Sequence, residues 1–139
     1  MAFTYNASTS ILNGLTGKSQ NISLLSNCYL ALSSTAPEKD GSNFTEPSAS
    51  TGYARAIVGV YNQAATQVMG TATEGSITNK DIIFFPEASS SWGTLTHFGL
   101  YTAATGGTLI LYGSLSTPIT VAANYVPLFR AGNFTLTLS

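Results

Sequence analysis

The sequence predicts a mainly β fold, an antiparallel β-sandwich of jelly-roll-like type with a short N-terminal α-helix. Apolar and polar residues alternate with a period of two in several short segments, about 8–20 residues apart. Turn-forming residues separate these segments, and the strand–helix–strand pattern of a parallel sheet is absent. The 139 residues contain no linker and no internal repeat, so we expect a single β-sandwich domain over residues 1–139.

The first twenty residues contain the one helix that the sequence predicts. The hydroxyl side chains of Ser8 to Ser10 can cap a helix start, and Ile11, Leu12 and Leu15 share one face. Gly14 and Gly17 limit the helix to two or three turns. Because so short a helix is marginal by itself, we expect its apolar face to pack on the sheet.

The period changes to two at residue 27, where Cys28, Leu30 and Leu32 alternate with less apolar neighbours. The hairpin turn at Gly106-Gly107 joins two further strands, and Phe134, Leu136 and Leu138 are expected to face inward in the last one. The seven or eight predicted strands are residues 27–33, 53–61, a weaker one at 67–73, 81–85, 95–101, 108–114, 119–121 together with 125–130, and 133–138. A polar loop over residues 34–51 is long for a compact domain, and such loops often bind partners.

Composition excludes several classes of function. Charged residues make up 8% of the chain, against about 25% in an average protein, and the net charge is −1. Such a chain has no basic patch for nucleic acid and no apolar run of the roughly 18 residues that cross a membrane. The N-terminal residues lack the pattern of a secretory signal, so we expect synthesis in a cytosol. Serine and threonine together account for 36 residues, which makes the chain rich in hydroxyl groups.

No constellation of catalytic residues is visible in the sequence. His97 is the only histidine, and we interpret it as a structural residue whose ring nitrogens bond backbone or hydroxyl groups. Cys28, the only cysteine, is interpreted as a small apolar residue of a strand and not as a nucleophile. The acids between Glu38 and Glu46 could offer oxygens to calcium, but their spacing does not fit the known loop template. We therefore expect no catalytic residue, no cofactor and no metal site, and hence no enzyme.

Several segments together resemble a family of small structural proteins of tailed bacteriophages, variously labelled tail-fibre or minor structural proteins. The resemblance runs in the same order from about residue 8 to the C-terminus. Its most specific pieces are Gly-Tyr-Ala-Arg at 52–55 and Trp-Gly-x-x-x-His-x-Gly at 92–99. The segments are Leu30–Pro37, Thr45–Ser48, Gly52–Arg55, Ile83–Ala88, Trp92–Tyr101 and Ala103–Gly113.

The resemblance implies a non-catalytic component of the virion whose partners are other capsid or tail proteins. It also implies that the chain is made in the cytoplasm of the bacterial host. The scarcity of charge and the many Tyr side chains add the expectation of a homo-oligomer. Because the chain is small and has neither shaft nor repeats, we slightly favour a capsid decoration over a tail-attached protein. The alternative is a receptor-binding tail-fibre tip that grips host carbohydrate through hydroxyl and aromatic side chains.

The motif residues of this resemblance are assigned roles in the fold and not in ligand binding. Arg55 is expected to pair with an acid or to cap carbonyl groups, and Trp92 to plug an end of the sandwich. Gly93 and Gly99 are expected to permit tight turns or close packing. The structural motif residues are therefore six: Tyr53, Arg55, Trp92, Gly93, His97 and Gly99.

Overall fold

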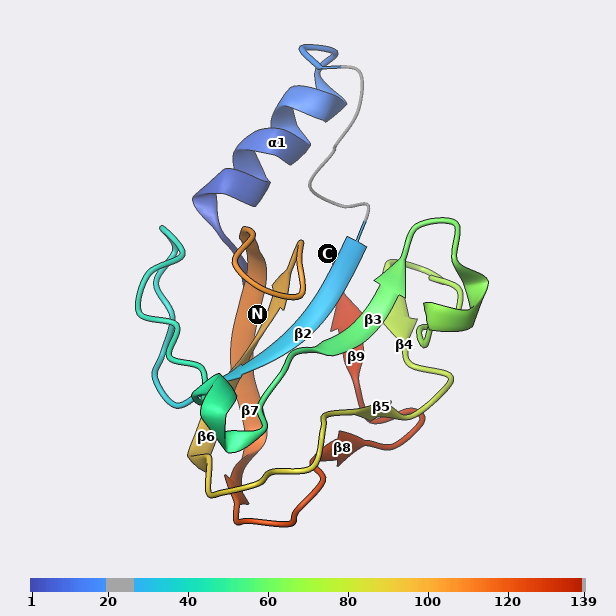
Figure 1. The fold of residues 1–139 in the computed structure, drawn as a ribbon. Coiled ribbons are helices and arrows are strands. Elements are labelled where there is room, and N and C mark those ends of the chain that lie inside the picture. The colour runs from blue at the N-terminus through green and yellow to red at the C-terminus, as the bar shows by residue number, and fades with distance from the viewer. Residues whose placement is uncertain (20–26, 139) are drawn as a thin grey trace.

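A five-stranded antiparallel sheet forms the larger layer of the protein (Figure 1). The computed structural model describes residues 1–19 and 27–138. The strand order is β1-β7-β6-β2-β3, in which every neighbouring pair is antiparallel. These strands span Ala2–Phe3 (β1), Asn27–Ser33 (β2), Ala56–Val60 (β3), Gly93–Tyr101 (β6) and Leu109–Val121 (β7).

Two short antiparallel ribbons form the second layer. One pairs β4 (Ser76–Thr78) with β9 (Thr135–Thr137), and the other pairs β5 (Ile83–Phe84) with β8 (Leu128–Phe129). The main apolar core joins the sheet to side chains from the ribbon segments, including the buried rings of Phe85 and Phe134. The mainly β, antiparallel fold with an N-terminal helix is therefore confirmed. The second layer consists of two separate ribbons and not of one continuous sheet.

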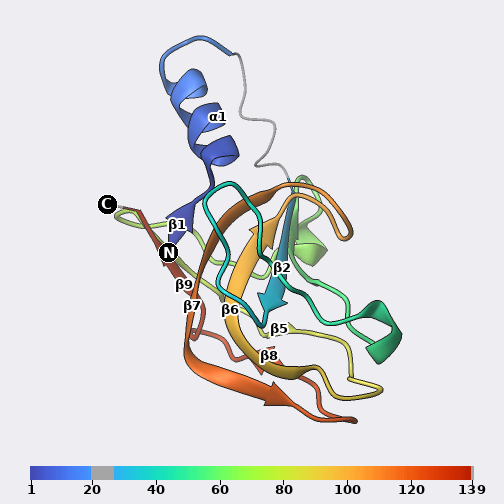
Figure 2. The ribbon, with the colours of Figure 1, turned by 90° about the vertical axis from the view of Figure 1, so that its left-hand side faces the viewer.

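Alternation along β2 explains how the sheet is covered on both faces. Leu30 and Leu32 enter the main core, whereas Ala31 points to the opposite face and joins a smaller cluster with Tyr101. Phe44, from the long polar loop, packs edge-on against Tyr101 with 5.3 Å between ring centroids. The loop predicted over residues 34–51 thus covers part of the second face of the sheet (Figure 2).

Strand β7 is longer than predicted, because residues 119–121 continue it and do not join residues 125–130 in one strand. The pairing with β6 shifts between Leu95 and His97, whose partners are Ile119 and Ser114. The extra residues of β7 form a bulge that contains Pro118. A proline fits there because it lacks the N–H that a regular strand would use.

The predicted cap and packing of the N-terminal helix are wrong. Helix α1 spans Tyr5–Leu15 and begins after Thr4, whose Oγ1 accepts a hydrogen bond from the backbone N–H of Ala7. The same hydroxyl donates to the carbonyl of Leu109 in β7 at 2.7 Å, so the start of the helix is tied to the sheet. Ala7 is the only buried residue of the helix, while Leu12 and Leu15 are 61% and 74% exposed.

Other boundaries also differ from prediction. Residues 53–55 precede β3 instead of belonging to it, and residues 67–73 make only isolated bridges through Met69 and Thr73. Of the residues expected to face inward at the C-terminal end, Phe134 is buried and Leu136 half-buried, but Leu138 is exposed. The short 3-10 helices Ala49–Thr51 and Ala64–Thr66 complete the described elements. Across residues 1–19 and 27–138, no helix has the length and apolar character needed to cross a membrane.

We expect Gly99→Ala to destabilise the protein by about 1–3 kcal/mol, because the core has no room for a methyl group there. A Cβ at Gly99 would lie 2.5 Å from Phe44 Cε2 and 2.6 Å from Leu109 Cδ1. Urea unfolding measures the change. The matched control is Gly59→Ala in β3, where a Cβ would meet Gln67 at an ordinary 3.5 Å. Equal unfolding midpoints for the two variants would contradict the close packing at Gly99.

Candidate functional site

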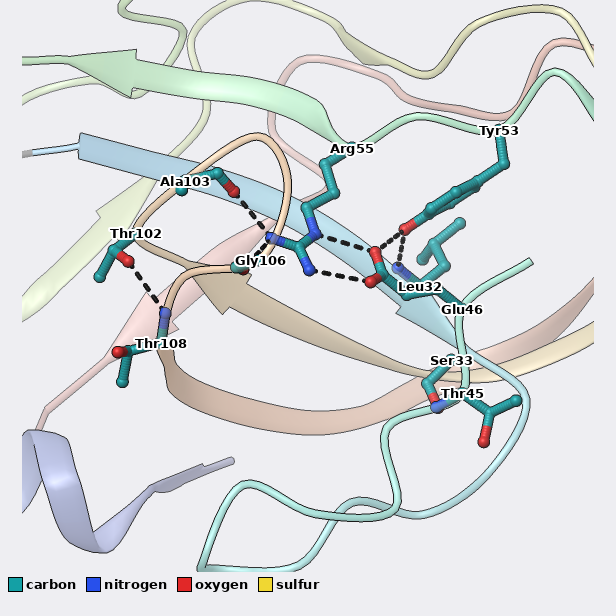
Figure 3. Close-up of polar contacts among 10 residues, drawn as sticks. All are labelled: Leu32, Ser33, Thr45, Glu46, Tyr53, Arg55, Thr102, Ala103, Gly106 and Thr108. Atoms are coloured by element: carbon teal, nitrogen blue, oxygen red, sulfur yellow. Dashed lines mark hydrogen bonds and ion pairs between the residues drawn. The ribbon is translucent and has the colours of Figure 1, made fainter. Parts of the chain in front are cut away.

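An ion pair between the buried side chain of Arg55 and the half-buried side chain of Glu46 is the centre of an extended polar network (Figure 3). Arg55 Nε and Nη2 each donate to one carboxylate oxygen of Glu46, both at 2.9 Å. The side chain of Arg55 is only 6% exposed. The two-pronged geometry matches the planar fork of a guanidinium, which makes such pairs among the strongest polar contacts in proteins.

The same guanidinium also fixes the turn between β6 and β7. Its Nη1 donates to the carbonyls of Ala103 at 2.8 Å and Gly106 at 2.7 Å. Its carbon atom lies 3.6 Å from the centre of the Tyr101 ring, which adds a cation–π contact. One side chain therefore joins the long loop, the β6–β7 turn and the start of β3.

Tyr53 extends the network to the middle of the sheet. Its hydroxyl donates to Glu46 at 2.6 Å and accepts from the backbone N–H of Leu32 in β2 at 3.2 Å. The ring packs edge-on against Trp92, with centroids 5.2 Å apart. Burial, followed by the hydrogen bond to Glu46, raises the pKa of Tyr53, so the hydroxyl stays protonated and remains a donor.

The charged groups of the network are bonded mainly to one another and to the backbone. Glu46 already accepts three hydrogen bonds, and Arg55 donates four. Burial opposes the charge of Arg55, but the hydrogen bond and the charge of Glu46 outweigh it and raise the arginine pKa. Among the described residues, no buried side-chain nitrogen or oxygen lacks a partner. The buried polar atoms of the network are therefore satisfied within the protein.

The structure brings Tyr53, Arg55 and Trp92 together and places the other predicted motif residues along β6. Trp92 is buried, and its Nε1 donates to the carbonyl of Thr51 at 2.9 Å. Gly93 has φ +75°, a conformation that favours glycine. Figure 3 shows that the network draws on Glu46, a residue that the sequence analysis named only among the loop acids.

His97 lies among hydroxyl side chains of the sheet. Its Nδ1 is 2.8 Å from Oγ1 of Thr96, and in the register of the sheet it stands beside Ser33 and Ser114. Nowhere in residues 1–19 and 27–138 do three His, Cys, Asp or Glu side chains gather in a group that could hold a metal ion.

The outer face of the β5–β8 ribbon is a second candidate site, of a different kind. In this ribbon, Ile83, Phe85 and Pro127 are buried, while the alternating positions point outward. We call the exposed apolar side chains here the ribbon face, which consists of Ile82, Phe84, Val126 and Leu128. A groove of about 460 Å³ borders it and is lined in part by Ile57, Val68, Ile82 and Phe84. Outward positions of an antiparallel ribbon are usually polar, so an apolar outer face is typical of a contact surface.

The comparisons with known proteins agree with the resemblance read from the motifs. A family model described as Podophage GP4 fiber I protein gp80 matches residues 2–137 of the chain. The matched residues run from β1 to β9 and include the Arg55 network. No curated protein matches the chain. The expected relationship to tailed-phage virion structural proteins is thereby confirmed.

We expect Arg55→Gln to destabilise the protein by about 2–3 kcal/mol, because it removes the hydrogen bonds of the guanidinium and leaves the half-buried Glu46 carboxylate without its charged partner. Arg55→Lys keeps the charge but loses the two-pronged geometry, and should recover only part of this loss. Chemical denaturation of both variants gives the comparison. The control is Arg130→Gln at an exposed arginine, expected within about 0.5 kcal/mol of the parent. A full recovery by lysine would show that charge alone matters at position 55.

We expect the thiol of Cys28 to react slowly in the native protein. Burial raises its pKa to about 12, so at pH 8 the reactive thiolate is about a thousandfold rarer than in the unfolded chain. Stability from the protonated thiol is present below the unfolded pKa of 9.0 and is lost as the pH rises towards 12. Mass spectrometry after iodoacetamide treatment, with and without denaturant, measures the reactivity. Equal labelling rates would contradict the burial of the thiol.

Proposed function

The chain belongs to the family of the Podophage GP4 fiber I protein gp80, and from that premise we propose that it is a subunit of a tail fibre. It is a structural protein of the phage virion and associates with other virion components. We further propose that it acts through shape and surface contact, without catalysis. The observation that carries the proposal is the family match over residues 2–137.

The geometry of the Arg55 network supports a structural role. The ion pair ties the long loop to the β6–β7 turn, and Tyr53 links both to β2. Loops held in this way offer a fixed surface to neighbouring proteins, and little ordering entropy is lost when they bind. The three hydrogen bonds that Glu46 accepts fit this role better than that of a catalytic acid or base.

Size alone favoured a capsid decoration, because the chain has neither shaft nor repeats. The family description names a fibre, and we therefore propose a tail position for this chain in preference to the capsid. The proposed partners are other fibre or tail proteins and further copies of the chain itself.

Carbohydrate binding at a fibre tip is the second candidate function. The exposed rings of Tyr61 and Tyr125 favour it, because aromatic faces can stack on sugars. Some of the hydroxyl groups that could bind sugars are already paired across strands. Thr94 and Thr120 lie 2.9 Å apart, as do Thr78 and Thr135.

We expect gold-labelled antibodies against the chain to mark the fibres of intact particles in electron microscopy. Image reconstruction should give a few copies to a few dozen per particle. Hundreds of copies on the head would overturn the tail position and favour a capsid decoration. The control is a particle made without this gene, which should lose both the label and the corresponding density.

A glycan array with the purified protein tests the second candidate. A blank array is expected for a subunit that only joins virion proteins. Specific binding that Tyr61→Ala or Tyr125→Ala removes would assign the chain to a receptor-binding tip.

A further inference from the structure

We propose that the outer stripe of α1 in one copy of the chain docks into the ribbon face and its groove on a second copy. This head-to-tail contact rests on the proposed function, since it states how subunits of a fibre would join. Neither surface is covered by the rest of the chain among the described residues.

Three of the four large side chains of the helix are exposed, and the fourth, Ile11, is half-buried beside the small residues that face the molecule. At 3.6 residues per turn, Tyr5, Leu12 and Leu15 fall within a sector of about 80° on one side. All three are exposed. Ala7 and Gly14 lie on the opposite side and are buried and half-buried, respectively. A helix that packed only on its own sheet would show the reverse arrangement.

The ribbon face offers a concave apolar surface of matching character. Phe84 is 64% exposed, and its cross-strand partner Leu128 points outward with it. The groove beside them has Ile57 and Val68 on its far side. A convex helix fits such a groove, whereas two grooves placed face to face would leave an empty space.

The chain cannot cover its own ribbon face with its own helix. Figures 1 and 2 show α1 projecting from one end of the molecule and the β5–β8 ribbon lying towards the other end. The start of the helix is fixed by the bonds of Thr4 to the carbonyls of Leu109 and Ile110. A second molecule is therefore needed to bring the two surfaces together.

Charge and area both suit a second copy as the occupant. The helix Tyr5–Leu15 carries no charged residue, and the groove has only Arg55, whose guanidinium is paired with Glu46. Two charges of each sign, Lys80, Asp81, Glu87 and Arg130, flank the ribbon face in the sequence and supply a polar rim.

The areas of the two surfaces are also similar. A fully exposed aromatic side chain contributes about 200 Å² and an aliphatic one about 100 Å². From the exposed fractions of its side chains, each surface then offers roughly 250 Å² of apolar area. With the usual polar share, one contact would bury about 900 Å², slightly less than the roughly 1,000 Å² of a stable biological interface. Such a contact is weak singly and gains strength through repetition.

A helix-to-groove contact is heterologous, because it uses two different surfaces of the same chain. Each copy then has one helix and one groove to offer, so copies join in a row or close into a ring. A helix-to-helix or ribbon-to-ribbon contact would instead stop at a dimer and leave the other surface uncovered.

The test uses the purified full chain and two variants, each of which removes one surface. The helix variant carries Leu12→Lys and Leu15→Lys, and the ribbon variant carries Phe84→Lys. Sedimentation over a concentration series should show the parent growing beyond a dimer. Each variant alone should need at least a tenfold higher concentration to associate. An equimolar mixture of the two should form a dimer, because one intact helix meets one intact groove.

The outcomes separate this contact from its alternatives. A parent that stays monomeric overturns the proposal, and so does a mixture without dimer. A variant that associates as the parent does would indicate an isologous contact and also overturn it. Leu138→Lys, at an exposed leucine outside both surfaces, should leave association unchanged. Circular dichroism confirms folding, and Leu128→Lys replaces Phe84→Lys if the latter unfolds. A monomeric parent with labelled fibres would refute the contact and keep the proposed function.

Discussion

The ion pair of Arg55 and Glu46 is the constraint on which the arrangement of the loops depends. Removing two charges from water is costly, and the cost is offset only when every donor and acceptor of the pair is satisfied. Here the guanidinium has two carboxylate and two carbonyl partners, and the carboxylate has a third donor in Tyr53. Because these groups come from three separate segments, the pair is satisfied in one arrangement of these loops. It thus specifies a conformation as well as stabilising it.

Most strands could be predicted from the sequence, because their burial follows the period of two. Strand β2 and strand β6 agree with prediction nearly residue by residue, since both lie in the middle of the sheet. Residues 67–73 have similar propensities but make only isolated bridges. The β propensity of a segment has little influence on whether it forms a strand when no neighbouring strand is placed to pair with it.

The helix face and the acid partner of Arg55 could not be predicted, for a different reason. The pattern of Ile11, Leu12 and Leu15 gives the same helix whether its apolar side faces the sheet or a neighbouring molecule. Glu46 was visible as part of the Thr45–Ser48 segment of the resemblance. Its pairing with Arg55 depends on how a long loop folds back, which local periodicity does not encode. The sequence therefore located the motif residues and left their partners to the tertiary structure.

The attachment of Thr4 has a consequence for the order in which the chain folds during synthesis. The hydroxyl that begins α1 bonds a carbonyl 105 residues later, and β1 pairs with β7 in the same region. Contacts between residues so distant in sequence form late in folding, because closing a long loop costs conformational entropy that other contacts must first offset. Helix α1 thus leaves the ribosome before the strand that fixes it in space. The apolar side chains of α1 therefore stay free until β6 and β7 have been synthesised. During that time they are available for premature association with other nascent copies of the chain.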